Sequence, residues 1–289
     1  MPAPVQETGA AEINGKIYVV GGLISGFNTV DAVRVYDIAA GTWSNAASLP
    51  EPVHHPNVAA AGGKLYVLGA LRAGSNNDTG ESWAYDPATN SWSTLTPMES
   101  GDERGAASTA VVGTKIYVAG GYGDYTHQAS LSSYDTATDT WDTSLPSMPG
   151  ARDHLAATAI GTRIYVIGGR EGDLYDVKNS VYIFDTANPS AGWSTGAAMP
   201  TARGGHAVGA VDGKIFAIGG EGNSGSGGIF DQVEYYDPVT NSWTSLGDME
   251  NPRHGMYAVY HNGSLYLAGG GQYAGLAPVA TFEVFTPSP

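Results

Sequence analysis

The sequence predicts an all-β fold built from about six copies of one four-stranded unit. Five tryptophans recur at nearly constant intervals, with separations of 49, 49, 52 and 50 residues: Trp43, Trp92, Trp141, Trp193 and Trp243. Glycine pairs recur in step with them, at Gly21-Gly22, Gly120-Gly121, Gly168-Gly169, Gly219-Gly220 and Gly269-Gly270, with a degenerate copy at Gly69-Ala70. A period near 50 residues is typical of repeat architectures, in which each unit buries its faces against its neighbours.

The composition agrees with many short strands and tight turns. The chain has 41 glycines, and only 14% of its residues are charged. No segment approaches the roughly 18 apolar residues of a membrane helix, and the first residues carry no hydrophobic signal segment. We expect a soluble domain, either cytoplasmic or secreted with its signal removed, and favour the second. The absence of cysteine excludes disulfides and thiolate metal sites.

The net charge of −15 disfavours two classes of partner. Nucleic acids and anionic membrane surfaces both attract basic proteins, so neither is expected to bind this chain.

The fifth copy shows the first half of the unit most clearly. His206–Val211 is a strand of small residues, which we name strand a. Asp212-Gly213 then suits a two-residue hairpin turn, and Asn14-Gly15 and Asn262-Gly263 take the same place in other copies. The apolar strand b, Lys214–Ile218, follows and ends at a glycine pair.

The second half of the unit is a further hairpin. Strand c, Val233–Tyr236, has alternating apolar and polar residues and is rich in aromatic residues. Asp237-Pro238 has the residues of a type I turn, and strand d carries Trp243. Each copy is therefore expected to form a four-stranded antiparallel meander.

These residues resemble the kelch repeat. The glycine pair after strand b, the Tyr-Asp that ends strand c and the later tryptophan match that motif over essentially the whole chain. The resemblance implies a six-bladed β-propeller with strand a along a central channel and strand d outermost. One domain, 1–289, would hold all six blades. Their approximate bounds would be 4–49, 50–98, 99–148, 149–199, 200–249 and 250–289.

The sixth copy lacks an obvious fourth strand. It runs through Met256–Ala268 and Thr281–Phe285 and has no tryptophan strand after that. Met1–Val5 contains two prolines, which makes it a poor substitute. Either this blade has three strands, or the parent protein continues beyond these ends. An open edge invites pairing with another chain, and we expect this blade to be the least protected from hydrogen exchange.

Arginines recur just before strand a. The aligned positions are Val5, Val53, Arg104, Arg152, Arg203 and Arg253. In a meander this position lies at the same end of the blade as the start of strand c. Six of the eight arginines therefore fall on one face, with Arg170 and Arg72 included.

Two interpretations of this cluster are open. A planar guanidinium pairs well with carboxylate or phosphate, which predicts a binding site for an anionic ligand. Alternatively, these arginines bridge backbone carbonyls or acids of the adjoining blade. The predicted binding residues are Arg104, Arg152, Arg203, Arg253, Arg170, Tyr122, Ser130, Ser180 and Gln232. Under the first interpretation, removing Arg152 and Arg203 together weakens binding at least tenfold and changes stability little.

Other chemistry is expected to be sparse. His154 and Glu221 are the candidates for acid–base catalysis. His54, His55, His154 and His254 adjoin the arginine positions, but none has local ligand spacing, so neither a metal site nor a cofactor is predicted. The glycine-rich segment 220–225 matches a dinucleotide motif but precedes a strand, which removes the helix that would hold a pyrophosphate.

Two function classes remain. The first is a binding module for an acidic peptide, a protein or a carboxylated glycan, and the even loop lengths favour it over an enzyme with a lid. The second is an enzyme on a small anionic sugar. Among kelch enzymes, copper radical oxidases need a cysteine and specifier proteins need an iron motif, and both are absent here. A sialic acid mutarotase-like epimerase is the enzyme class that remains.

Overall fold

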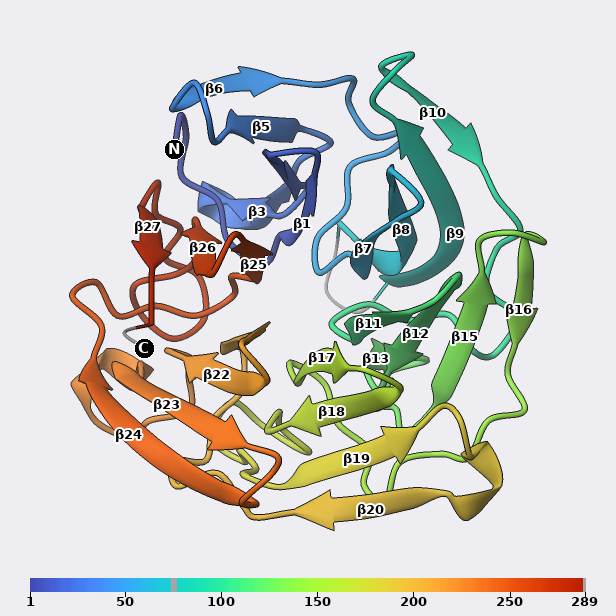
Figure 1. Cartoon of the computed structure of the whole chain (residues 1–289). Coiled ribbons are helices and arrows are strands. Elements are labelled where there is room, and N and C mark those ends of the chain that lie inside the picture. The colour runs from blue at the N-terminus through green and yellow to red at the C-terminus, as the bar shows by residue number, and fades with distance from the viewer. Residues whose placement is uncertain (74–76, 288–289) are drawn as a thin grey trace.

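The computed structural model describes residues 1–73 and 77–287. Six sheets surround a central channel, and the chain passes through them in order round the ring (Figure 1). Within each sheet the strands follow chain order from the channel outward. The six-bladed propeller predicted from the sequence is confirmed, and among the described residues helical structure is confined to three short 3-10 turns, Ser25–Phe27, Pro189–Ala191 and Ser226–Gly228.

Five blades have four antiparallel strands. Blade one contains β1 (Gly9–Ile13), β2 (Lys16–Val20), β5 (Val33–Asp37) and β6 (Thr42–Asn45). Blade two contains β7 (Val58–Ala61), β8 (Lys64–Arg72), β9 (Asn77–Asp86) and β10 (Ser91–Thr94). Blade three contains β11 (Ser108–Val112), β12 (Lys115–Ala119), β15 (Leu131–Asp135) and β16 (Thr140–Asp142).

The next two blades repeat this pattern, and the sixth does not. Blade four contains β17 (Ala156–Ile160), β18 (Arg163–Ile167), β19 (Val181–Asp185) and β20 (Trp193–Gly196). Blade five contains β21 (Ala207–Val211), β22 (Lys214–Ile218), β23 (Gln232–Asp237) and β24 (Ser242–Asp248). Blade six has three strands among the described residues: β25 (Ala258–His261), β26 (Ser264–Ala268) and β27 (Phe282–Phe285).

Two small hairpins lie in the loops between strands b and c, which we call the b–c loops. β3 (Leu23–Ile24) pairs with β4 (Asn28–Thr29) in blade one, and β13 (Tyr122–Gly123) pairs with β14 (Thr126–His127) in blade three. Both stand at the end of their blade where strand a begins, which is the face predicted to carry the site.

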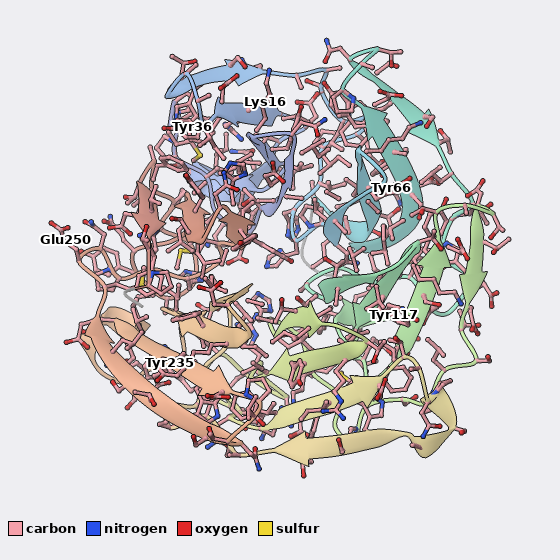
Figure 2. All side chains as sticks on the ribbon, viewed as in Figure 1. Lys16, Tyr36, Tyr66, Tyr117, Tyr235 and Glu250 are labelled. Atoms are coloured by element: carbon pink, nitrogen blue, oxygen red, sulfur yellow. The ribbon has the colours of Figure 1, made fainter. Side chains whose placement is uncertain are left out.

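The hydrophobic core is divided into six clusters, one between each pair of neighbouring blades. Strand b supplies fully buried branched residues such as Ile116 and Ile164 to these clusters. Side chains, among them Tyr66 and Tyr117, fill the spaces between the sheets (Figure 2). The tryptophan strands add a hydrogen bond between blades: Trp193 Nε1, for example, donates to the Pro146 carbonyl of the preceding blade at 2.8 Å.

The glycine pairs permit a close approach of two blades. At Gly120, φ is 61° and a Cβ atom would lie 2.7 Å from the Arg152 carbonyl oxygen of the next blade. The adjacent Gly121 N–H donates to that same carbonyl at 2.7 Å. A side chain here would break this junction, which explains why glycine recurs in the repeat.

The N-terminal segment lies against blade six without forming a fourth strand. The Met1 ammonium group donates to the Ala280 carbonyl at 2.9 Å, and Val5 N–H donates to the Val279 carbonyl at 3.2 Å. Among the described residues, blade six therefore has three strands. In the described part of the chain, no helix is long and apolar enough to cross a membrane.

Candidate functional site

A closed ring of backbone hydrogen bonds narrows the channel. Its members are the residues two positions after the aligned arginine sites: Glu7, His55, Ala106, His154, Gly205 and Gly255. Each N–H donates to the carbonyl of the previous member at 2.8–3.0 Å, and Glu7 closes the circle onto Gly255. All six have positive φ, between 49° and 63°. We call these six residues the channel ring.

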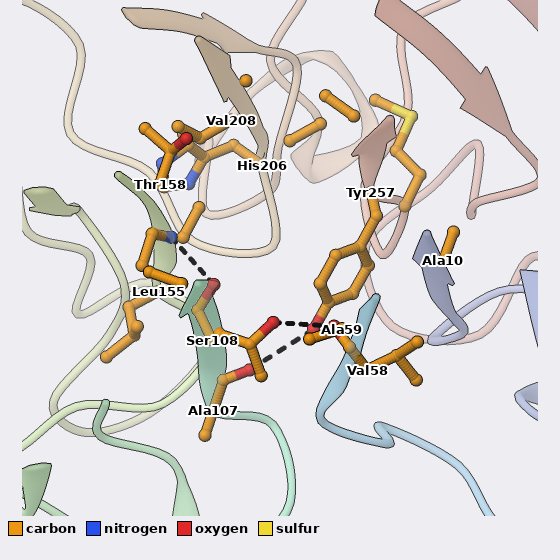
Figure 3. Close-up of a pocket in the computed structure, with 18 of the residues that line it drawn as sticks. Ala10, Val58, Ala59, Ala107, Ser108, Leu155, Thr158, His206, Val208 and Tyr257 are labelled. Atoms are coloured by element: carbon orange, nitrogen blue, oxygen red, sulfur yellow. Dashed lines mark hydrogen bonds between the residues drawn. The ribbon is translucent and has the colours of Figure 1, made fainter. Parts of the chain in front are cut away.

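The channel ring separates two cavities. The larger, of about 820 Å³, opens on the face of the b–c loops, and we call it the mouth cavity. The smaller, of about 380 Å³, lies among the alanine-rich strands a (Figure 3). Tyr257 crosses the channel there, and its hydroxyl donates to the Ala107 carbonyl on the opposite side at 3.3 Å. Glu7, His55 and His154 line both cavities.

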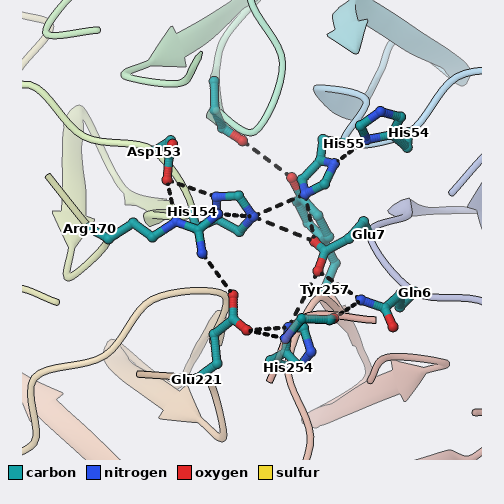
Figure 4. Close-up of polar contacts among 12 residues, drawn as sticks. Gln6, Glu7, His54, His55, Asp153, His154, Arg170, Glu221, His254 and Tyr257 are labelled. Atoms are coloured by element: carbon teal, nitrogen blue, oxygen red, sulfur yellow. Dashed lines mark hydrogen bonds and ion pairs between the residues drawn. The ribbon is translucent and has the colours of Figure 1, made fainter. Parts of the chain in front are cut away.

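Arg170 is the central cation of the mouth cavity (Figure 4). Its Nε donates to Asp153 at 2.8 Å, its Nη1 donates to Glu221 at 3.1 Å, and its Nη2 lies 3.1 Å from His154 Nε2. Burial lowers the pKa of Arg170, but the two carboxylates outweigh burial and raise it above its usual value. This guanidinium is therefore charged and held from three directions.

Hydrogen bonds fix the tautomers of two neighbouring histidines. His54 Nε2 lies 3.0 Å from the Arg72 carbonyl, which can only accept, so this nitrogen carries the proton. Burial and the neighbouring His55 lower the pKa of His54 to about 3, which keeps the ring neutral. His54 Nδ1 is then an acceptor for His55 Nδ1, 2.5 Å away. His55 consequently presents the lone pair of its Nε2 to the channel.

The same reasoning applies to His154. Its Nδ1 lies 2.8 Å from the Asp153 carboxylate, so Nδ1 carries the proton and Nε2 the lone pair. His154 Nε2 is 3.0 Å from His55 Nε2, and the Glu7 carboxylate is 3.1 Å from the same His55 atom. Three electron-pair donors thus meet on the channel ring.

His254 lies between the carboxylates of Glu7 and Glu221. Its Nδ1 lies 3.3 Å from both Glu7 and Glu221. Burial lowers the pKa of His254, but Glu221 and Glu7 more than compensate, so the pKa is raised.

Four predicted ligand-binding arginines lie elsewhere. Arg104, Arg152, Arg203 and Arg253 are buried inside their own blades and do not line the mouth cavity. Each guanidinium donates to the carbonyl of the first glycine of its blade's glycine pair, at 2.7–3.1 Å: Gly120, Gly168, Gly219 and Gly269. Their placement corrects the prediction of an arginine-lined mouth. They are structural bridges, as the alternative proposed, but their partners lie in their own blade and not in the adjoining one.

The other predicted contacts divide in the same way. Ser180 accepts from Arg152, and the Gln232 carbonyl accepts from Arg203 at 2.7 Å, so both belong to the buried bridges. Ser130 pairs through its carbonyl with Gly120 N–H and is not among the cavity's lining residues. Tyr122 does line the mouth cavity, where its ring packs edge-on against His127. His154 and Glu221, the predicted acid–base candidates, both contact Arg170.

Glu7 is the main residue that the sequence prediction omitted. A signal for it exists, because it stands two residues after Val5, just as His55 and His154 stand two residues after Val53 and Arg152. The prediction aligned the arginine positions but did not extend the alignment to these neighbours.

Comparison with known proteins agrees with the propeller fold. The family model described as the KLHDC2/KLHL20/DRC7 Kelch-repeats domain matches residues 58–271, and the Kelch motif model matches residues 6–50. The chain belongs to the kelch-repeat family. Together the two matches cover five complete blades and part of the sixth.

Individual kelch relatives differ in how much of them the chain spans. Kelch-like protein terF of Aspergillus terreus is 36% identical over 98% of this chain, and the match covers 65% of that protein. The F-box/kelch-repeat protein At1g67480 of Arabidopsis thaliana is 38% identical over 31% of this chain and 23% of its own length. The chain therefore spans less than two thirds of either relative.

A solved structure supports the architecture. The structure of YjhT superposes with a TM-score of 0.82 over 99% of this chain and 96% of that one, at 21% sequence identity. At that identity the likeness concerns the fold alone.

Proposed function

We propose that this kelch propeller is a binding module whose mouth cavity takes a carboxylated glycan, with Arg170 as the carboxylate contact. The observation that carries the proposal is the position of Arg170. Within the described residues it is the one arginine or lysine that lines the 820 Å³ cavity. Three of its five N–H groups are engaged, so two remain for a carboxylate.

The remaining groups favour hydroxyls over further negative charge. Glu7, Asp153 and Glu221 line the same cavity and would repel a ligand that carried several charges. They are strong acceptors for hydroxyl donors, whereas Arg170 suits a single carboxylate. A sugar acid satisfies both requirements better than a phosphate or an acidic peptide does.

Aromatic side chains on the rim provide surfaces for a longer glycan. Phe27, Tyr125, Tyr175 and Tyr273 are 56–74% exposed and stand in the b–c loops of four different blades. Exposed aromatic rings offer flat apolar faces, and the three tyrosines add a polar hydroxyl at the edge; such rings are common in binding surfaces. They support a ligand that extends from the cavity over this face.

Calorimetric titration tests the proposal directly. We expect glucuronate or sialic acid to bind and the corresponding neutral sugars to bind at least about tenfold more weakly, because a charge-assisted contact contributes about 1.5–3 kcal/mol. Arg170→Lys keeps the charge but loses the planar fork, and should weaken acid binding by a similar factor. Arg163→Lys, at the exposed start of β18, is the matched control. Equal affinity for acidic and neutral sugars would contradict the proposal.

A second candidate, proton transfer on the same ligand, is favoured by one observation. His154 and Glu221 approach Arg170 from two blades, and both side chains line the mouth cavity. A base and an acid beside a bound sugar acid are what an anomer-exchanging epimerase requires. Exchange spectroscopy between the sugar's anomers would detect this activity, which Glu221→Gln should abolish. Binding of the sugar acid without faster exchange between its anomers would exclude the enzyme and support the binding module.

A further inference from the structure

We propose that Glu7, His55 and His154 form a binding site for a zinc-class divalent cation on the channel ring. One ligand atom from each of these side chains lies within 4.8 Å of the other two. The three residues come from the start of three different blades, and their side chains reach the channel between the two cavities (Figure 4). This inference stands independently of the glycan proposal.

The first argument is electrostatic. The hydrogen bonds of His54 and Asp153 place the protons of His55 and His154 on Nδ1, so both Nε2 atoms carry lone pairs. These Nε2 atoms lie 3.0 Å apart, and a Glu7 carboxylate oxygen lies 3.1 Å from one and 4.0 Å from the other. Three acceptors facing one another repel, and the Arg170 guanidinium relieves this repulsion only at His154, from 3.1 Å. A divalent cation bound by all three removes this repulsion.

The second argument is the spacing of the ligand atoms. Zinc binds imidazole nitrogen and carboxylate oxygen at about 2.0–2.2 Å, which places neighbouring tetrahedral ligands roughly 3.3 Å apart. Two of the three separations here are within a few tenths of an ångström of that value. The third, between His154 and Glu7, must shorten by a small rotation of the carboxylate. Two histidines and one glutamate also form a known catalytic zinc set, in which a fourth position stays open.

The third argument is the support behind each ligand. Asp153 holds His154 through Nδ1, and His54, itself bonded to the Arg72 carbonyl, holds His55 through Nδ1. Glu7 keeps its second oxygen 3.3 Å from His254. Metal-bound histidines nearly always have such a partner on the other ring nitrogen, because it fixes the tautomer and the ring orientation.

The fourth argument is the backbone conformation. Positive φ costs a residue with a side chain about 1–2 kcal/mol, and glycine adopts it freely. Blades five and six place glycine at this position of the channel ring, Gly205 and Gly255. Glu7, His55 and His154 hold this conformation at equivalent positions with polar side chains that line both cavities, whereas Ala106 holds it with a methyl group that supplies no ligand.

Arg170 is the competitor that a metal must displace. Its Nη2 lies 3.1 Å from His154 Nε2 and shares that lone pair. The contacts of its Nε and Nη1 with Asp153 and Glu221 do not involve the lone pair and can persist when a metal binds. The cavity holds three carboxylates, from Glu7, Asp153 and Glu221, against this one guanidinium and the two histidines that contact them, His127 and His254.

Titration of the chelator-treated full chain with Zn²⁺ tests the site. We expect one zinc per chain, and a rise in melting temperature on zinc addition. His154→Gly removes a ligand and places at this ring position the residue found in blades five and six, so the fold should persist while zinc affinity falls at least about 100-fold. Ala106→Gly is the matched control, because it makes the same backbone change on the same ring without removing a ligand.

A second metal and a support variant complete the test. Co²⁺ should give visible absorption bands with the wild type and Ala106→Gly, and none with His154→Gly. Asp153→Asn, which weakens the hold on His154, should lower zinc affinity about 10- to 100-fold. Equal zinc affinity in the wild type and His154→Gly would overturn the proposal, as would the absence of zinc binding to a folded wild type.

Discussion

At the residue scale, arginine serves two opposite purposes in this chain. Arg203 is fully buried and bridges carbonyls of its own blade, whereas Arg170 reaches the mouth cavity. Both positions lie at the same end of a blade. Arg203 precedes strand a, whereas Arg170 follows the glycine pair that ends strand b. Residue type and spacing gave both the same expectation. Only the side-chain direction distinguishes a structural bridge from a ligand contact.

Replacement of Arg203 by methionine should therefore destabilise the protein. Its guanidinium pairs with Glu234 at 2.5 Å, and both side chains are at most 3% exposed. Loss of one partner leaves a buried charge unpaired, which costs about 3–5 kcal/mol of unfolding free energy. Urea denaturation measures this loss. The double replacement of Arg203 and Glu234 by methionine should recover part of it, and Arg163→Met should cost under about 0.5 kcal/mol. A loss below 1 kcal/mol in Arg203→Met would refute the structural role.

His206 should make stability depend on pH. It is fully enclosed, and burial together with Arg203 lowers its pKa to about 3. In the unfolded chain the pKa is about 6.5, so between pH 6.5 and 3 the unfolded state binds one more proton than the folded state. Stability should fall as the pH falls through this window, by up to about 1.4 kcal/mol per unit from this group.

His206→Leu isolates that contribution. Its free energy of unfolding, measured in urea from pH 7 to 4.5, should decline less steeply than that of the wild type. His261→Leu, in the a–b hairpin of blade six, changes a histidine outside the cavity and serves as the control. Identical slopes for the wild type and His206→Leu would show that the buried ring does not titrate as argued.

At the element scale, the tryptophan strands lock each blade to the one before it. Four indole N–H groups donate to carbonyls of the preceding blade at 2.8–3.0 Å, from Trp92, Trp141, Trp193 and Trp243. Trp43 differs: its ring packs on Phe282 of blade six, with centroids 5.2 Å apart, and its N–H has no such bond within the described residues.

This difference predicts unequal effects of the same substitution. Trp193→Phe removes an inter-blade hydrogen bond and should cost about 1 kcal/mol beyond the loss of ring area. Trp43→Phe loses ring area alone and should cost less. Melting temperatures of the two variants, compared in one buffer, provide the measurement. A larger loss for Trp43→Phe would mean that packing at the ring closure outweighs the hydrogen bonds.

The elements were predictable because their signals are local. Turn pairs such as Asp212-Gly213 and apolar runs such as Lys214–Ile218 are read within a few residues, and the latter coincides with β22. The site was only partly predictable, because its members come from different blades. His55 and His154 stand 99 residues apart and yet approach within 3.0 Å. Alignment of equivalent positions in the six repeats finds such residues, but it does not show which way their side chains point.

At the scale of the whole molecule, the ring is closed by the N-terminal segment without a shared strand. The Gly270 N–H donates to the Val5 carbonyl at 2.9 Å. The four other glycine pairs make the same bond to the next blade, and Glu7 completes the channel ring. A cluster that includes Ile17, Val259 and Phe282 packs blade six against blade one. Closure therefore depends on the inner edge of the blades, where the candidate site lies.

The outer edge of blade six remains open, and this has a measurable consequence. β27 pairs with β26 on one side, and no strand of the described chain pairs with its other side. The equivalent strand of blade five, β23, is covered by β24. Outward-facing amides of β27 should therefore exchange their hydrogens with solvent without unfolding of the blade, so their free energy of opening should be near 0. The amides of β23 should need a free energy of opening of several kcal/mol.

Hydrogen exchange followed by mass spectrometry or NMR on the monomer compares the two strands within one molecule. Inward amides of β27, which face β26, are the internal control and should stay protected. Uniform protection across all six blades in a verified monomer would contradict the open edge. Protection that appears only at higher protein concentration would instead identify β27 as a surface for pairing with another chain, because an uncovered strand is a template for such pairing.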